Sequence, residues 1–197
     1  IKKFEVLPAE FSVEGGELTA TMKLFPAIVT LHLLGGLILL ALLCVQAVRY
    51  QQAADHQLPV VVSTAMRVAL MGVSVLLALQ ITLGGWVSTN YAVLACNTFP
   101  TCQGSWWPTM NLSQGFEVWR PLGQTSSGEH ISFAALTGIH YMHRLLAYVV
   151  MAALLYMAWR LWHVIALRRA AKVVLSLTVW QFLTGLSNVV LDWPLVA

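Results

Sequence analysis

Histidine and arginine side chains inside an apolar run are the first residues of this sequence that could do chemistry. Residues 136–148 read LTGIHYMHRLLAY and contain His140, His143 and Arg144. Another apolar run contains His32 in TLHLLGG. Burying an ionisable group in hydrocarbon is costly, so such residues in a membrane segment indicate a functional site. Neutral imidazole is a common metal ligand, and heme iron takes axial histidines.

Each of these side chains also has a structural explanation. A histidine can be held by a hydrogen bond between helices. His140 and His143 are three residues apart and share one helical face. Ligation is favoured over packing for histidines at matched depth on parallel helices beside an arginine, which is the arrangement expected below for His32 and His143. Arg144 needs a partner at this depth, either a heme propionate that suits its guanidinium fork or backbone carbonyls. The other histidines are interpreted as solvated residues of loops and helix ends: His56, His130 and His163.

The composition places these residues in a membrane protein. Of the 197 residues, 58% are hydrophobic and 10% are charged, whereas soluble domains carry about 25% charged residues. The net charge of +3 is too small to indicate a nucleic-acid partner. Four apolar runs are long enough to span a bilayer. We therefore expect an all-α fold, a polytopic transmembrane helical bundle with spanning helices at about 24–48, 66–87, 133–159 and 171–191.

The basic residues predict the orientation of this bundle. They gather in the first and third connections between the predicted helices: Arg49, Arg67, Arg160, Arg168, Arg169 and Lys172. By the positive-inside rule both connections are cytoplasmic. The loop at about 88–132 then faces the periplasm of a bacterium, as does an extracytoplasmic N-terminal segment, 1–22, before the membrane domain, 23–197. The sequence thus predicts a multi-pass protein of the bacterial inner membrane.

A weak internal similarity relates the first and third predicted helices. His32 precedes Arg49 by 17 residues, and His143 precedes Arg160 by the same number. At about 1.5 Å per residue, each histidine lies roughly 25 Å from its arginine. We therefore expect two helices that run in the same direction, each with a histidine in the outer half of the bilayer.

Three cysteines and two glutamine–glycine pairs complete the candidate residues. Cys96 and Cys102 bracket ACNTFPTC in the outer loop, where an oxidising compartment permits a disulfide, either structural or redox-active. Two cysteines alone are too few for a metal site. Cys44 is predicted to be a free, buried thiol of the first helix. The second and fourth helices each place a glutamine four residues before a glycine, which suits close packing of a helix or a flat macrocycle equally well: Gln80 with Gly84, and Gln181 with Gly185.

Three stretches resemble a known family. TMKLFPAIVTLHLLGG (21–36), QITLGGWVSTNYAVLACNTFPTCQGSWWP (80–108) and ALTGIHYMHRLLA (135–147) are similar to bacterial heme A synthases, which are related to a mitochondrial cytochrome oxidase assembly factor. The resemblance implies two similar halves of four membrane helices, each with a histidine pair toward the outer face. It implies an oxidoreductase that converts the C8 methyl of heme O to the formyl of heme A for cytochrome c oxidase.

The resemblance also implies roles for individual residues. His143 matches a ligand to the iron of a heme b cofactor, with Arg144 as a propionate contact, and His32 matches a histidine that faces the substrate, heme O. His140 stands where the other half of the family has an acidic residue. The Cys96/Cys102 loop matches the outer loop of the C-terminal half. Implied partners are heme O synthase, cytochrome c oxidase assembly proteins and the lipid bilayer, and self-association is left open.

The match to the family is incomplete, and two other functions remain in view. No counterpart of family helices one to three or of the last helix is present, so the chain is expected to be a fragment or to work with other chains. A thiol–quinone oxidoreductase also has periplasmic cysteines, although it normally carries a second pair. A cytochrome b-type electron carrier would place two histidines on facing helices.

Overall fold

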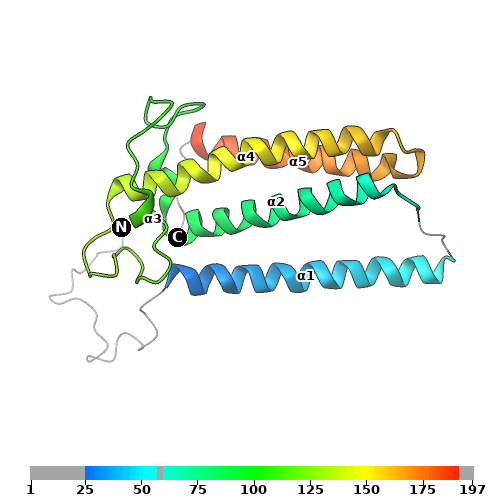
Figure 1. Ribbon diagram of the computed structural model, residues 1–197, viewed down its shortest axis with the longest axis horizontal. Coiled ribbons are helices and arrows are strands. Elements are labelled where there is room, and N and C mark those ends of the chain that lie inside the picture. The colour runs from blue at the N-terminus through cyan, green and yellow to red at the C-terminus, as the bar shows by residue number, and fades with distance from the viewer. Residues whose placement is uncertain (1–24, 57–59, 191–197) are drawn as a thin grey trace, which may run out of the picture.

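The bundle is built from long helices that lie side by side (Figure 1). The structure is a computed structural model and describes residues 25–56 and 60–190. The long helices are α1 (Pro26–Ala54), α2 (Thr64–Thr89), α4 (Phe133–Trp162) and α5 (Arg168–Val190), which follows the short η2 (Ile165–Leu167). Four helical segments are long and apolar enough to cross a membrane, the last of them including η2. This confirms the predicted all-α transmembrane bundle with four spanning helices.

Local signals set the start of each long helix. Pro26 occupies the first turn of α1, where its missing N–H is not needed. The Ser63 hydroxyl accepts a 3.2 Å hydrogen bond from the Met66 amide at the start of α2, and Ser132 does the same for Ala135 at the start of α4. The expected N-terminal segment, 1–22, lies outside the described residues.

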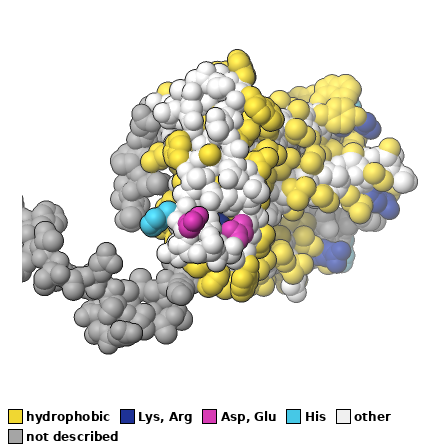
Figure 2. Space-filling model, turned by 60° about the vertical axis from the view of Figure 1, so that its left-hand side comes forward, with side chains coloured by type: hydrophobic (Ala, Val, Ile, Leu, Met, Phe, Trp, Pro, Cys, Tyr) yellow, Lys and Arg dark blue, Asp and Glu magenta, His cyan; other side chains and the backbone are white. Residues whose placement is uncertain are grey.

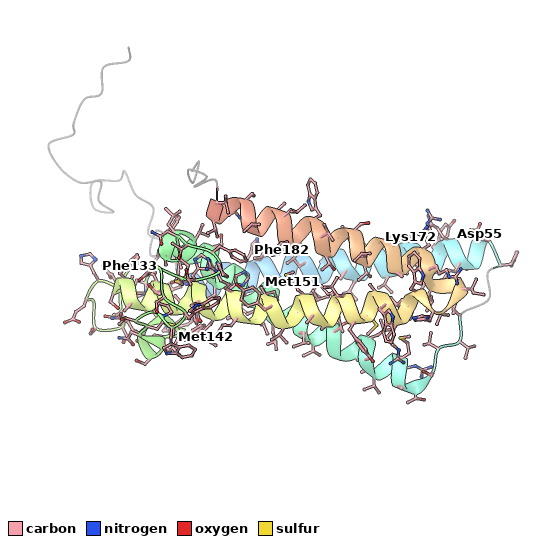
Figure 3. The ribbon with its side chains drawn as sticks, turned by 90° about the horizontal axis from the view of Figure 1, so that it is seen from above. Asp55, Phe133, Met142, Met151, Lys172 and Phe182 are labelled. Atoms are coloured by element: carbon pink, nitrogen blue, oxygen red, sulfur yellow. A yellow bond between two sulfur atoms is a disulfide. The ribbon has the colours of Figure 1, made fainter. Side chains whose placement is uncertain are left out.

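The two ends of the bundle differ in chemistry. The loop at 90–132 closes one end, which we call the loop end, and contains η1 (Ala92–Ala95) and α3 (Leu112–Gly115). The α1–α2 and α4–α5 connections lie at the other end, which we call the basic end (Figure 1). Figure 3 labels Asp55 and Lys172 at the basic end and Phe133 at the loop end. Figure 2 looks toward the loop end and shows Lys and Arg gathered at the far end of a largely hydrophobic surface. Helices α1 and α4 start at the same end and run in the same direction, as predicted.

The long helices differ in which other helices they contact. Helix α4 packs against both α2 and α5, whereas α1 packs against α2. Near the loop end, Trp86 and Ile139 belong to one buried cluster, and near the basic end Met157 and Leu161 belong to another. Most apolar side chains of α1 are exposed, including Leu31 at 65%. Helix α4 is therefore the centre of the described bundle, and α1 is its edge.

The outer loop folds down onto α4 at close range. The Trp86 indole nitrogen donates a 2.9 Å hydrogen bond to the Gly115 carbonyl. A methyl group added at Gly115 would lie 2.8 Å from the Ala135 carbonyl oxygen, and one added at Gly138 would lie 2.9 Å from Leu112. At Gly115 the close atom belongs to the backbone, so glycine is needed there, whereas at Gly138 the end of the Leu112 side chain could move aside. The loop is thus packed onto the helix that carries His140, His143 and Arg144.

Candidate functional site

The His143 ring lies against α2. The side-chain nitrogen of Gln80 is 3.1 Å from Nδ1 and 3.3 Å from Nε2 of His143, and 3.3 Å from its carbonyl oxygen. One turn further along α2, a methyl group added at Gly84 would lie 3.2 Å from Cε1 of His143. Gln80 and Gly84 therefore form a cradle beside the imidazole ring of His143. The spacing of the glutamine and the glycine in the sequence did not predict that they contact this ring.

Heme ligation by His143 stays a prediction, and the contacts of its ring bear on it. A metal-bound histidine uses one ring nitrogen for the metal and offers the other to a hydrogen-bonding partner. The Gln80 side-chain nitrogen lies within hydrogen-bond distance of both ring nitrogens of His143, and the Gln80 side-chain oxygen is buried without a hydrogen-bond partner. The described residues contain no group of three or more His, Cys, Asp or Glu side chains that could hold a metal ion. A single histidine could hold heme iron, because the porphyrin itself would supply four nitrogen ligands.

His140 contacts a different element from His143. Its ring is buried, and Nδ1 lies 3.0 Å from the Ala92 carbonyl oxygen in η1. A carbonyl accepts, so Nδ1 carries the proton in this contact. Three residues along a helix leave the two side chains about 60° apart in direction, which sends His140 to the loop and His143 to α2. In the structure His140 therefore fastens η1 to α4.

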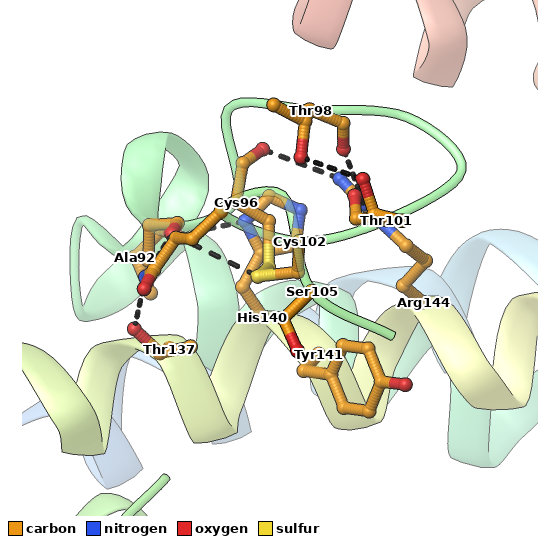
Figure 4. The surroundings of a disulfide bond; sticks show 12 residues. Ala92, Cys96, Thr98, Thr101, Cys102, Ser105, Thr137, His140, Tyr141 and Arg144 are labelled. Atoms are coloured by element: carbon orange, nitrogen blue, oxygen red, sulfur yellow. Dashed lines mark hydrogen bonds between the residues drawn. A yellow bond between two sulfur atoms is a disulfide. The ribbon is translucent and has the colours of Figure 1, made fainter. Parts of the chain in front are cut away.

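Arg144 reaches the loop that carries the cysteines (Figure 4). Its Nη1 donates 2.7 Å hydrogen bonds to the carbonyls of Thr98 and Thr101, and its Nη2 donates a 3.2 Å bond to the carbonyl of Cys96. The side chain is only 7% exposed. Of the two partners considered for Arg144, the structure describes the backbone carbonyls, and the propionate contact stays a prediction.

Cys96 and Cys102 form a disulfide in the structure, with an S–S distance of 2.00 Å. Both cysteines are buried, at 1% and 0% exposure. Gln103 fixes the loop by donating 2.8 Å hydrogen bonds to the Ala95 carbonyl and the Thr137 hydroxyl of α4. The Cys44 thiol is free, as expected, but it is exposed on α1. The prediction that it is buried was wrong, because this face of α1 meets no other described helix.

A second buried arginine was missed by the sequence analysis. Arg120 is completely buried and donates hydrogen bonds of 2.5 Å to the Asn90 side-chain oxygen and 3.2 Å to the Gln124 carbonyl. Its guanidinium carbon lies 5.9 Å from the centre of the Trp86 ring. Burial lowers the pKa of Arg120, but a guanidinium stays charged in proteins. An arginine in an outer loop gives no sequence signal of burial, so nothing in the sequence could have found it.

His32 lies apart from these contacts. Thr30 and Leu33 of α1 face α2, each with a side-chain carbon 3.2 Å from a methyl group added at Gly85. Thr30 also makes a 3.2 Å hydrogen bond with Thr89. This rotation of α1 leaves His32 exposed. Within the described part of the chain, no contact joins His32 to His143.

Two shallow hollows lie away from the histidines. One, of about 240 Å³, lies where α1 and the end of α2 meet the loop, and it is lined in part by Pro26, Tyr91 and Leu122. The other, of about 360 Å³, lies at the basic end of α1 beside Cys44 and Arg49. The first is smaller than the pockets that hold drug-sized ligands, which begin at about 300 Å³. Neither is lined by a histidine, so neither is taken as the heme site.

Comparison with known proteins assigns the family. Residues 13–197 match the cytochrome oxidase assembly protein family, COX15-CtaA. The chain belongs to this family. It is 36% identical over 194 residues to a heme A synthase of Shewanella oneidensis strain MR-1. That match covers 98% of this chain and 58% of the relative, so the chain spans a little over half the length of the curated relative. No solved structure matches the chain significantly.

Proposed function

We propose that the protein containing this chain is a heme A synthase, an oxidoreductase that converts the C8 methyl group of heme O to the formyl group of heme A. The observation that carries the proposal is the 36% identity to a protein of that name across 98% of the chain. The cradle of Gln80 and Gly84 around His143 supports it independently, because an oriented histidine in a membrane helix suits heme ligation.

Within this proposal the two histidines have separate roles. His143 would hold the iron of heme b, which would supply one-electron transfer when bound. His32, exposed on α1, faces heme O. Turning a methyl into a formyl group adds one oxygen atom, removes two hydrogen atoms and withdraws four electrons. The chain's residues are assigned the binding and orientation of hemes in this reaction, and Arg144 is proposed to hold both the loop and a propionate.

The membrane context supports the proposed location and partners. Heme O and heme A are hydrophobic, so transfer between membrane proteins avoids exposing them to water. We place the protein in the bacterial inner membrane with the basic end toward the cytoplasm, following the positive-inside rule. Heme O synthase would supply the substrate, and cytochrome c oxidase assembly proteins would receive the product. The exposed side chains of α1 are available to further helices or to a second copy.

Burial of the disulfide weighs against a thiol–quinone oxidoreductase. Thiol–disulfide exchange requires a thiolate to reach one of the two sulfurs. Cys96 and Cys102 are almost fully buried, and Arg144 and Gln103 hold the segment around them. These contacts favour a structural bridge.

The proposed function is tested in the whole protein purified from membranes. The wild type is expected to show a heme Soret band, and His143→Ala is expected to lose or shift it. His163→Ala, at the exposed C-terminal end of α4, is the matched control and should keep the band. Extracted pigments from cells that also make heme O should contain heme A with the wild type. A wild type that binds no heme and forms no heme A would overturn the assignment.

A further inference from the structure

We propose that the uncharged part of the outer loop binds the membrane surface, with Trp106 and Trp107 inserted into the headgroup region of the leaflet at the loop end. Both side chains are largely exposed, at 70% and 71%. The partner is the lipid itself, because an indole combines an apolar ring with an N–H donor and is enriched where the bilayer meets water. Neither residue has a role in the proposed function.

The composition of the loop is the first support. Residues 91–116 contain no Asp, Glu, Lys, Arg or His. They expose large apolar side chains instead: Tyr91, Leu94, Phe99, Trp106, Trp107 and Leu112. The charged residues of the loop follow in 117–130: Glu117, Arg120, Glu129 and His130. Exposed aromatic side chains without charge suit the membrane surface, and charge suits the water beyond it. The loop therefore divides into a lipid-facing part and a water-facing part.

The contacts of Tyr141 set the level of the two indoles along α4. The Tyr141 hydroxyl donates a hydrogen bond to the Trp106 carbonyl. The Trp107 ring lies edge-on against the Tyr141 ring, and their centroids are 5.8 Å apart. At about 1.5 Å per residue, Tyr141 lies roughly 12 Å from Phe133 at the start of α4. The loop thus reaches down beside the first turns of α4 as far as Tyr141.

The length of α4 places the membrane boundary at the same level. The helix has 30 residues and is roughly 45 Å long, which exceeds the hydrocarbon core of about 30 Å. An arginine and exposed aromatic side chains mark the other boundary at the basic end: Tyr156, Trp159, Arg160 and Trp162. Tyr141 lies roughly 28 Å from Arg160 along the helix. One hydrocarbon thickness from the basic end therefore reaches Tyr141 and the two indoles, and the turns of α4 before Tyr141 project beyond it.

The side of the bundle that the loop occupies favours lipid over a further protein segment. The Phe99 ring lies 6.4 Å from the Phe182 ring of α5. Figure 1 shows this green part of the loop, around residue 100, on the side of α4 away from α1. The edge helix α1 packs against α2 and has most of its apolar side chains exposed. Segments that cover α1 in the whole protein need not reach Trp106 and Trp107.

The test measures depth in the whole protein reconstituted in phosphatidylcholine vesicles. A nitroxide is attached to one cysteine at a time, in Phe133→Cys, Trp107→Cys and Val149→Cys, with Cys44 and any other free cysteine replaced by serine. Phe133 and Val149 are exposed, and they lie roughly 12 Å from Tyr141 on either side along α4. Oxygen concentrates in the bilayer and a nickel chelate in water, so the ratio of their collision rates with the nitroxide reports its depth.

We expect this ratio to rise several-fold from Phe133 to Trp107, and to rise again from Trp107 to Val149. A ratio at Trp107 equal to that at Phe133 would place the loop in water and overturn the proposal. A label at Trp107 that neither reagent reaches would show that a protein segment covers this position, which overturns it as well.

A second measurement observes the two indoles directly and needs no cysteine variant. Trp106→Phe and Trp107→Phe together remove their fluorescence, so the difference from the wild type isolates these two rings. Phosphatidylcholine brominated near the top of its acyl chains should quench most of this difference, and iodide in the water should quench little of it. Quenching by iodide alone would contradict the proposal, even if the cysteine variants fail to accumulate.

Discussion

Helices α1 and α4 share a sequence feature, but the histidine of each helix has different surroundings in the structure. Each has a histidine 17 residues before an arginine, and each starts at the loop end. On α4 the histidine is enclosed by Gln80 and Gly84, and the next residue is bonded to three carbonyls of the loop. On α1 the histidine is exposed. The difference shows that a polar residue of a membrane helix becomes part of an enclosed site only where neighbouring segments cover it.

The largest difference in unfolding free energy is expected between substitutions of an arginine on α4 and an arginine on α1. Arg144→Leu leaves three loop carbonyls without their donor, which should cost on the order of 3 kcal/mol or more of unfolding free energy. Arg49→Leu, at the exposed basic end of α1, should change it by less than about 0.5 kcal/mol. Unfolding of the 197-residue chain in detergent, followed by circular dichroism, measures both. Equal losses would contradict the contrast.

The cysteines give the next largest expected difference. Replacing Cys96 and Cys102 together by serine removes a buried crosslink that Arg144 and Gln103 surround. We expect a loss of about 2 kcal/mol and faster protease cleavage of the outer loop. Cys44→Ser on α1 is the control and should match the wild type in both measurements, because its thiol is exposed.

Added methyl groups probe the packing of the two regions. Gly115→Ala places a carbon 2.8 Å from the Ala135 carbonyl oxygen, and the required shift should cost about 1 kcal/mol or more. Gly36→Ala on α1 meets nothing within 4 Å and should be neutral or stabilising, because alanine favours a helix over glycine. Thermal unfolding of the two variants gives the comparison. A destabilised Gly36→Ala variant in the whole protein, but not in this chain, would show that further segments cover α1.

The smallest effect on stability is expected at His32. His32→Ala should leave the unfolding free energy within about 0.5 kcal/mol, because the side chain is exposed. In the whole protein it should keep the heme b spectrum but reduce conversion of heme O to heme A. Pigment extraction and chromatography measure the product. Loss of the heme b spectrum in this variant would place His32 in the same site as His143 and remove the contrast.

The fold followed from the sequence more directly than the site did. Apolar length alone predicts spanning helices, since a bilayer needs about 20 apolar residues to be crossed. The partners of His143 and Arg144 depend on how the helices rotate and where the loop folds back, and apolar periodicity does not fix either. His140 illustrates this limit: its spacing predicts a face shared with His143, but a 60° difference in direction sends it to Ala92. The sequence gave no signal that Arg120 would be buried.

The carbonyl partners of Arg144 have a consequence for how the protein enters the membrane. In the proposed orientation residues 90–132 would be translocated before α4 is inserted, because synthesis proceeds from the N-terminus. An arginine at the centre of a membrane helix costs about 2.5–3.5 kcal/mol on translocon scales. The carbonyls of Cys96, Thr98 and Thr101, which accept hydrogen bonds from Arg144 in the fold, would then already lie on the far side when Arg144 arrives. The order of segments along the chain thus makes the outer loop a docking platform for the helix that follows it.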